Sequence, residues 1–437
     1  MLHHSILKYL TSAVALLDSV QAAPLDLDAY GLHVDLAGLM LTRRRSLEKR
    51  ASFTYGKANK VRGVNLGGWF VLEPWITPSI FSSDSIVDEY TYTKSLGKEQ
   101  ASSQLTNHWK SWITQADFSV IAGAGLNHVR IPIGYWALIS RNEDPYVQGQ
   151  LPILDQAIQW ARGAGLKVML DLHGAPESQN GFDNSGKYGP VGWQSGSSVQ
   201  QTLDALSKLA DRYKGDTDVV TSIELLNEPL GTSLDLNGVK DFYSQGISTV
   251  RSKSQNYAIS ISDAFQDFSS YWNGQYVNQN VILDTHQYQI FSPEQVSQSP
   301  ASHISAACAL GPKLAGLDKP GVVGEWTGAQ TDCAKYLNGR NKGARYDGTF
   351  TGPQGGSNYV GDCKGKDTGT VAGLSSDDKS NIRAFVEAQL DAYEQGAGWV
   401  FWTWKTESAP EWSMKDLIAG GLFPQPLDNR QHPGQCG

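Results

Sequence analysis

After about residue 60, the chain alternates short apolar segments with longer amphipathic ones. The short segments are rich in β-branched residues and read as buried strands, whereas the longer ones repeat apolar residues every three or four positions and read as helices. The predicted strands are Val61–Leu66, His128–Ile133, Lys167–Leu172, Ser222–Leu226, Ala258–Ser262, Val281–Asp284, Gly321–Gly324 and Trp399–Thr403. The predicted helices include Asp155–Gly163, Val199–Tyr213, Val239–Lys253 and Asp377–Gln395.

Regular alternation of strands and helices is typical of an α/β fold with a parallel sheet. It favours a single (β/α)₈ TIM barrel over residues 51–437, with extended loops on the C-terminal face. An open doubly wound sheet is the alternative, but segment 62–69 does not match the glycine-rich phosphate loop of such folds. The glycine-rich stretch from Asp332 to Ser376 has weak periodicity, and we expect it to form an ordered insertion on the C-terminal face.

The N-terminus carries two processing signals. Lys8 precedes an apolar run and small residues follow up to Ala22, which predicts a signal peptide over residues 1–22, with a buried helix as the alternative. The dibasic pair Lys49-Arg50 predicts that residues 23–50 are a propeptide, so that the mature chain starts near Ala51. We therefore expect a secreted protein, extracellular or associated with the cell wall, without a membrane anchor.

Composition limits the classes of partner and cofactor. The 437 residues are 40% hydrophobic and carry a formal net charge of -8, which supports a full-sized core and argues against binding nucleic acid. We expect a monomer without a cofactor. The four cysteines, Cys308, Cys333, Cys363 and Cys436, lack a C-x-x-C spacing and predict two disulfides rather than a zinc site. Three pairings are possible, and the spacing does not choose between them.

Two glutamates follow predicted strands. Glu228 lies in Asn-Glu-Pro after the fourth strand, and Glu325 directly follows the seventh. Because barrel active sites lie at the C-terminal ends of strands, both side chains can share one pocket. Glycoside hydrolysis needs two carboxyls, one protonated and one ionised. A structural or helix-capping role is the alternative for either glutamate alone, whereas the pair favours a hydrolase.

A set of ordered motifs surrounds these glutamates. They are Arg62–Trp69, Val71–Trp75, Val129–Trp136, Asp171–Pro176, Asn180–Gly186, Asn227–Pro229, His286–Tyr288 and Phe401–Lys405. In these motifs the chain resembles the fungal exo-β-1,3-glucanase branch of glycoside hydrolase family 5, from about residue 55 to the end. Asn-Glu-Pro alone marks a broad clan, but the ordered set is highly specific.

The resemblance implies a role for each matching residue. Glu228 is expected to be the general acid/base with a pKa above that of a free carboxyl, and Glu325 the ionised nucleophile. Asn227 is expected to bind the sugar 2-hydroxyl and Trp402 to form the floor of the subsite. The implied substrate-binding residues are Glu73, Arg130, His173, Phe182, Asp183, Asn227, His286, Tyr288, Phe291 and Trp402. The family pattern also favours pairing Cys308 with Cys436 and Cys333 with Cys363.

Several of these residues have a structural alternative. Arg130 fits a structural ion pair at the barrel end, and Phe182 and Phe291 fit packing beneath loops. Trp402 and Trp404, two apart on a predicted strand, are expected to share a face and fit a core role. The histidines also fit a metal site, but we find no acidic or cysteine residue to complete a ligand set and expect no metal.

The resemblance implies retaining exo-hydrolysis that releases glucose from the non-reducing ends of wall β-1,3-glucan through a glycosyl-enzyme. Four alternatives stay open: hydrolysis of β-1,6- or mixed-linkage glucan, transglycosylation, an inverting reaction, and a non-catalytic glucan-binding wall protein. One position departs from the family pattern. Glu177 stands where the family commonly has glycine, which changes the backbone freedom of this loop or adds a charge near the cleft.

Overall fold

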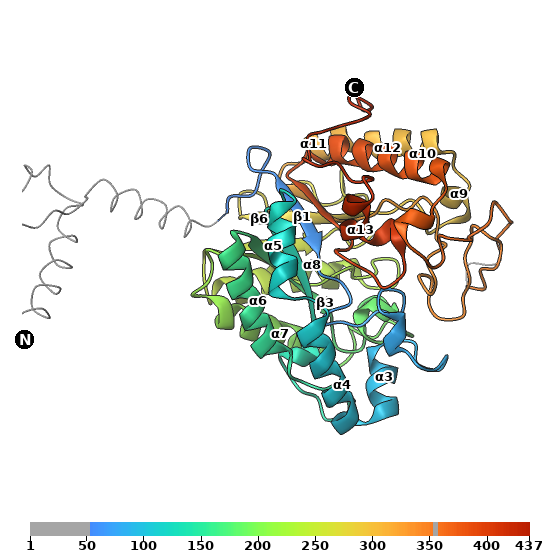
Figure 1. Ribbon diagram of the computed structural model, residues 1–437. Helices are drawn as coiled ribbons and strands as arrows, with labels where there is room; N and C mark the ends of the chain where they lie inside the picture. The colour runs from blue at the N-terminus through green and yellow to red at the C-terminus, as the bar shows by residue number, and fades with distance from the viewer. Residues whose placement is uncertain (1–52, 353–356) are drawn as a thin grey trace, which may run out of the picture. The chain divides into compact units, whose positions relative to one another are not determined.

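The computed structural model describes residues 53–352 and 357–437. Eight parallel strands form a closed barrel in chain order, with β1 pairing with β8, so the predicted TIM barrel is confirmed and the open sheet is wrong. Figure 1 shows α6 (Gln150–Ala164) and α12 (Ser376–Tyr393) on the outside of the strands. The strands are β1 Val61–Asn65, β2 His128–Gly134, β3 Lys167–Gly174, β4 Val220–Glu224, β5 Ala258–Ser262, β6 Val281–Gln287, β7 Gly321–Trp326 and β8 Gly398–Phe401. The predicted signal peptide and propeptide lie outside the described residues.

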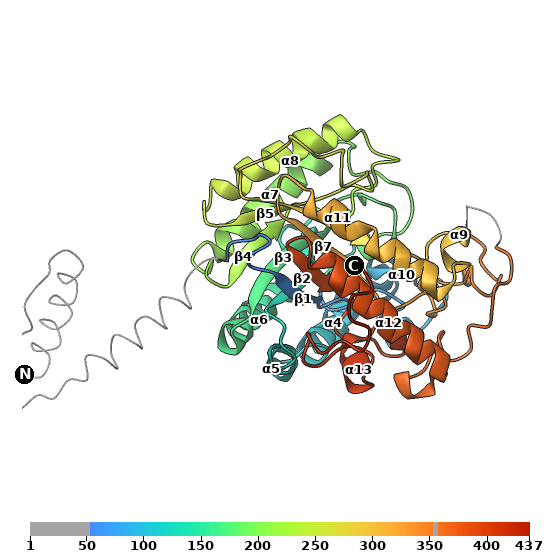
Figure 2. The same cartoon turned by 90° about the horizontal axis from the view of Figure 1, so that it is seen from above.

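Helices surround the barrel, and Figure 2 shows α6, α7, α8 and α12 around the strands. These four correspond to the predicted helices: α6 Gln150–Ala164, α7 Ser198–Tyr213, α8 Leu236–Arg251 and α12 Ser376–Tyr393. The other helices are α3 Glu89–Leu96, α4 Lys98–Ser111, α5 Gln115–Gly123, α9 Pro293–Val296, α10 Pro300–Cys308, α11 Leu310–Ala315 and α13 Met414–Ala419. Short 3₁₀ turns are η2 Pro78–Ile80, η3 Tyr135–Ala137, η4 Asp183–Ser185, η5 Val371–Gly373 and η6 Pro410–Trp412. None of the described helices is long and apolar enough to cross a membrane.

The barrel interior is apolar near the N-terminal ends of the strands. Tyr55 packs against this layer, and its hydroxyl contacts Thr221 Oγ1 at 2.6 Å and donates to Ser222 Oγ at 3.2 Å. The segment before β1 therefore covers the N-terminal end of the barrel. The residues of the layer are Val61, Met169, Ala258, Ile282, Val322 and Val400.

Further along the same strands, the interior becomes charged. Arg130 on β2 forms ion pairs with Asp171 on β3, Glu224 on β4 and Asp284 on β6, and all four side chains are fully or almost fully buried. Buried charges are tolerated only where they neutralise and hydrogen-bond one another. The C-terminal half of the barrel is thus built around an ion network rather than a hydrocarbon core.

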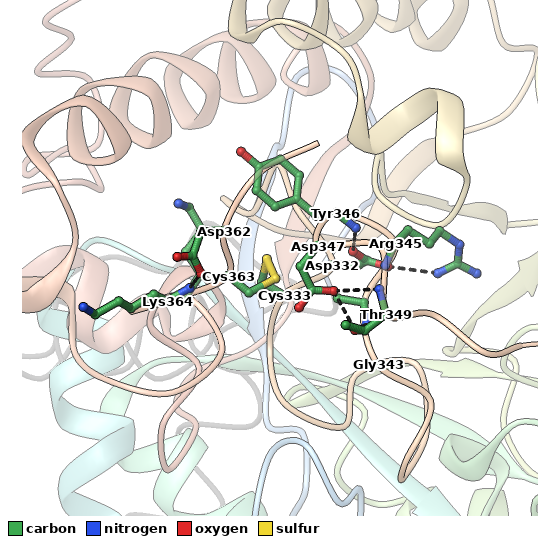
Figure 3. The surroundings of a disulfide bond; sticks show 12 residues. Asp332, Cys333, Gly343, Arg345, Tyr346, Asp347, Thr349, Asp362, Cys363 and Lys364 are labelled. Atoms are coloured by element: carbon green, nitrogen blue, oxygen red, sulfur yellow. Dashed lines mark hydrogen bonds and ion pairs between the residues drawn. A yellow bond between two sulfur atoms is a disulfide. The ribbon is translucent and has the colours of Figure 1, made fainter. Parts of the chain in front are cut away.

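Both disulfides implied by the family resemblance are present, Cys308–Cys436 and Cys333–Cys363. The second closes the expected insertion after β7 (Figure 3). Next to it, the buried Asp332 carboxylate accepts from the backbone N–H groups of Arg345 at 2.8 Å and Tyr346 at 3.0 Å. Tyr346 packs against the apolar cluster that contains Trp402, so the described part of the insertion lies on the C-terminal side of the barrel, as predicted.

Candidate active site

Glu228 lies four residues beyond the end of β4, where Leu225 and Asn227 still donate backbone hydrogen bonds to β5 and β3. Its φ of 45° is uncommon for a residue with a side chain, and such conformations concentrate at functional sites. Its Oε1 lies 2.8 Å from Nδ1 of His286, and its Oε2 accepts from Nδ2 of Asn184 at 3.1 Å. The carboxylate is therefore held on both oxygens.

Glu325 lies within β7, in register with His286 on β6. Its Oε1 accepts from Nη1 of Arg130 at 3.0 Å, and its Oε2 accepts from the Tyr288 hydroxyl at 2.9 Å. The side chain is only slightly exposed, so these two donors replace the water that would otherwise solvate the carboxylate. This fixed geometry suits a nucleophile, because little reorganisation precedes attack.

The two carboxylates face the same point. Glu228, His286 and Glu325 each offer one polar atom, and these atoms lie within 4.8 Å of one another. Retaining glycosidases separate their two carboxyl groups by about 5–5.5 Å, whereas inverting ones leave about 6.5–9.5 Å for a water molecule. The separation therefore favours the retaining geometry over the inverting alternative.

The predicted order of the two pKa values is wrong. Burial raises the pKa of Glu228, but the hydrogen bond and charge of His286 outweigh it and leave that pKa below its usual value. Burial also raises the pKa of Glu325, and here the charges of His286 and Arg130 only partly offset it. The close contact between His286 and Glu228 reverses the expected order, and the sequence contains no sign of that contact.

Arg130 connects the network to the substrate side. Beyond its ion pairs, it donates from Nη2 to Oδ1 of Asn227 at 2.9 Å, which leaves Nδ2 of Asn227 buried without a partner among the described residues. Nε2 of His173 is likewise buried and unpaired, while its Nδ1 contacts Oδ2 of Asp171 at 2.6 Å. Buried polar atoms are nearly always hydrogen-bonded, so these two atoms suit sugar hydroxyls. Arg130 is thus both a structural ion pair and a direct partner of Glu325.

Trp402 stacks on His173, with ring centroids 5.5 Å apart and planes at 7°. The expectation that Trp402 and Trp404 share a face is wrong. Trp402 packs in the apolar cluster with Trp75, whereas Trp404 lies in the main core and donates from Nε1 to Oδ1 of Asp117 at 2.9 Å. The strand ends at Phe401, so the alternation of faces does not continue to these residues.

Glu73 and Asp183 form an acidic corner of the site. Oε2 of Glu73 accepts from Nε1 of Trp75 at 2.9 Å. Burial, reinforced by the Asp183 charge, raises the pKa of Glu73 well above its usual value. Burial, with the Asp88 charge, raises the pKa of Asp183 to about 7. The corner therefore presents carboxyl oxygens that can bind adjacent sugar hydroxyls.

Phe182 and Phe291 do not pack beneath loops, because their side chains are 40% and 41% exposed. The Phe182 ring contacts Phe265 edge-on with centroids 6.4 Å apart, and the Phe291 ring contacts Tyr288 at 5.5 Å. Exposed rings close to a polar site suit stacking on pyranose faces. Phe265, itself 45% exposed, was not predicted.

The expectation that no acidic residue completes a ligand set around the histidines is wrong. His286 approaches two carboxylate pairs, Glu224 with Asp284 and Glu228 with Glu325. These carboxylates already have positive partners, because Arg130 contacts Glu224, Asp284 and Glu325. Part of their charge is therefore already balanced by a protein side chain.

The other residues missed by the sequence reasoning carried weak signals. Asn184 and Asp171 lie inside the recognised motifs, Asp284 ends a predicted strand, and Glu325 directly follows one. Glu224 is the last residue of β4. Carboxylates at or next to strand ends are thus a shared sequence signal of Glu224, Asp284 and the two catalytic glutamates.

Glu177 does not add a free charge to the cleft. Its carboxylate accepts from Nη2 of Arg141 at 2.7 Å and from Nζ of Lys187 at 2.8 Å, and these partners lower its pKa. Its backbone oxygen accepts from the N–H of Gly192 at 2.9 Å, which closes the loop that carries Phe182. Glu177 has a φ of 63°, a conformation that glycine adopts without strain.

We expect Glu177→Ala to destabilise the protein more than Glu177→Gly. Both variants lose partly exposed ion pairs worth about 0–1 kcal/mol, but only glycine relieves the strain of the positive φ, worth about 1 kcal/mol. Thermal and urea unfolding of the two variants measure the difference. Equal stability of the two would show that φ at this position stores no strain.

The sequence has close curated relatives. A family model described as cellulase (glycosyl hydrolase family 5) matches residues 93–346. A glucan 1,3-beta-glucosidase of Blumeria graminis is 58% identical over 399 residues, covering 89% of this chain and 92% of that protein. A probable glucan 1,3-beta-glucosidase A of Emericella nidulans is 54% identical, covering 87% and 93%. The crystal structure of a rutinosidase from Aspergillus niger matches 86% of this chain and all of that chain with a TM-score of 0.66 at 20% identity, which shows a shared fold.

Proposed function

Because the chain belongs to glycosyl hydrolase family 5, we propose that it releases glucose from the non-reducing ends of β-1,3-glucan with retention of configuration. The observation that carries the proposal is the close approach of Glu228 and Glu325, with Arg130 and Tyr288 on the latter. The names and high identity of the curated relatives support the β-1,3 linkage.

In the first step, an oxygen of Glu325 attacks the anomeric carbon as the glycosidic bond breaks. Glu228 transfers a proton to the departing oxygen, so the leaving chain departs as an alcohol. Arg130 and Tyr288 hold Glu325 at the attacking position. Nδ2 of Asn227, buried and free to donate, binds the sugar 2-hydroxyl, a contact that strengthens in the transition state.

In the second step, Glu228 takes a proton from a water molecule, which attacks the same carbon and releases Glu325. Two displacements at one carbon restore the original configuration. His286 and Asn184 hold the Glu228 carboxylate in place for this proton transfer.

The remaining residues determine which sugar is bound. Trp402, stacked on His173, forms an apolar floor for the glucose ring, and Glu73 and Asp183 bind its terminal hydroxyls. Recognition of terminal hydroxyls favours cleavage at the chain end. The exposed rings of Phe182 and Phe291 hold the next sugar.

The proposal extends to location. The two disulfides fit an oxidising compartment. With the signals at residues 1–22 and 23–50, they support a secreted, processed protein that acts on wall glucan.

Product analysis of laminarin digestion tests this function. We expect glucose as the first product, appearing as the β-anomer in proton NMR spectra recorded within the first minutes, before mutarotation. Oligosaccharides as early products would contradict the exo mode, and the α-anomer would contradict retention.

A further inference from the structure

Arg130 is outnumbered by acidic groups. Its guanidinium lies 3.2 Å from Asp171, 2.9 Å from Glu224, 3.0 Å from Glu325 and 3.9 Å from Asp284. Four ionised carboxylates around one guanidinium would leave a buried excess of negative charge, which is strongly unfavourable. At least one of these groups is therefore expected to carry a proton.

The hydrogen bonds of Glu224 and Asp284 are consistent with a proton held by this pair of carboxyls. Oε2 of Glu224 accepts from Nε of Arg130 at 2.9 Å, and Oδ1 of Asp284 accepts from the backbone N–H of Gly324 at 2.8 Å. The other oxygens, Oε1 of Glu224 and Oδ2 of Asp284, are buried without a partner among the described residues. Glu224, Asp284 and His286 each offer a polar atom within 4.8 Å of the others. A proton on one of these two carboxyls gives a free oxygen a hydrogen to donate and removes one charge.

We propose that Glu224 and Asp284 share one proton beneath the catalytic centre, and that Asp284 thereby acts through His286 as a positioning residue for the catalytic proton of Glu228. Glu224 is the proton carrier and Asp284 stays anionic, facing Nε2 of His286 at 3.7 Å. This inference rests on the proposed glycosidase function for its kinetic part only.

The charges around His286 fit this arrangement. The ring faces Asp284 on its own strand, Glu228 after β4, and Glu325 on β7. A carboxyl oxygen of Glu224 on β4 lies within 4.8 Å of the ring, and Arg130 contacts Asp284 at 3.9 Å. Burial lowers the pKa of His286, but the charges of Glu325 and Asp284 and the contact with Glu228 raise it well above its usual value.

The pKa values of Glu224 and Asp284 also agree with a proton on Glu224 and a charge on Asp284. Burial raises the pKa of Glu224 well above its usual value in spite of Arg130. For Asp284, the hydrogen bond and charge of His286 overcome burial and hold the pKa low.

The consequence concerns the proton that Glu228 uses. Nδ1 of His286 and Oε1 of Glu228, 2.8 Å apart, hold one exchangeable proton between them. Glu228 gives this proton to the leaving oxygen, and the His286–Glu228 pair regains a proton from the attacking water. The pair therefore holds the same number of protons before and after each turnover. The basic limb of the pH–rate profile therefore reports the His286–Glu228 pair.

Asp284→Asn tests the link to His286. The amide keeps an oxygen for the N–H of Gly324 but removes the negative charge that stabilises protonated His286. The pair then loses its proton at lower pH, so the basic limb of kcat/KM on laminarin moves down by about one unit or more. A basic limb that stays in place would overturn the role of Asp284.

Glu224→Gln tests where the proton resides. Glutamine reproduces a protonated Glu224, because its oxygen accepts from Arg130 and its amide donates toward Asp284. The basic limb is expected to stay in place, and the infrared band of one protonated carboxyl at pH 7 to disappear from the difference spectrum. If Glu224→Gln instead shifts the basic limb as far as Asp284→Asn does and loses no infrared band of a protonated carboxyl, Glu224 is ionised and the proposal is overturned.

Glu411→Gln is the matched control. Glu411 is a buried carboxyl with a free Oε2 and with its pKa raised by burial to about 8, and it has no contact with His286 or Glu228. This variant should lose an infrared band and leave the profile in place. If the wild-type protein does not hydrolyse laminarin, or Asp284→Asn does not fold, two measurements still decide. The first is the infrared band of the protonated carboxyl, and the second is the NMR titration of His286, each recorded for the wild type and for Glu224→Gln. If Glu224→Gln retains the band, or shifts the titration of His286, the proposal that Glu224 and Asp284 share a proton is overturned.

Discussion

Replacing Glu325 by glutamine is expected to leave the barrel folded and to lower kcat on laminarin by ~10³-fold or more. Glutamine has the same shape and still offers an oxygen to Nη1 of Arg130, but its neutral amide is a very poor nucleophile. Because burial raises the pKa of Glu325, removing its charge is not expected to lower the melting temperature. Initial rates and thermal unfolding measure the two effects.

Glu411→Gln controls for this change, because it makes the same substitution at a buried glutamate outside the site. Near-normal turnover by Glu325→Gln would remove Glu325 from the nucleophile role. A loss of activity that accompanies unfolding would indicate a structural role instead.

Glu228→Ala is expected to separate substrates by their leaving groups. Turnover of laminarin should fall by ~10²–10⁴-fold, because its leaving alcohol needs a proton. Dinitrophenolate leaves a dinitrophenyl glucoside without being protonated, so the variant still forms the glycosyl-enzyme from this substrate. The glycosyl-enzyme then accumulates, because no base activates the water. A rapid burst of dinitrophenol followed by slow turnover measures this accumulation, and added azide should speed the second step.

Equal losses on both substrates would remove Glu228 from the acid/base role. Asn184→Ala is an informative companion, because Asn184 touches Glu228 but carries no proton for the reaction. We expect Asn184→Ala to lower the turnover of both substrates by similar factors, smaller than those of Glu228→Ala.

The sequence was sufficient to predict the barrel and the placement of the two glutamates. Strand periodicity is a local property, and the C-terminal ends of parallel strands always meet at one face. Glu228 and Glu325 were therefore predictable as neighbours before any distance was known. The disulfide pairing, by contrast, depended on the family resemblance, since spacing alone leaves three choices.

The electrostatics of the site were not predictable in the same way. The pKa of Glu228 depends on a contact of 2.8 Å with His286, which side-chain rotamers and a positive φ determine. The proton shared by Glu224 and Asp284 depends on two strands that are not adjacent in the barrel. Such contacts are properties of the assembled interior, and no pattern along one strand encodes them.

The two disulfides are nested, and this has a consequence for proteolysis. Cys308–Cys436 closes a covalent ring that contains Glu325 and Trp402, and Cys333–Cys363 closes a smaller ring inside it. Tyr359, 69% exposed, offers a cleavage point within the smaller ring. A protease that cuts there opens only that ring, and both halves of the chain stay joined. The nicked enzyme would migrate as one species until a reductant separates its fragments.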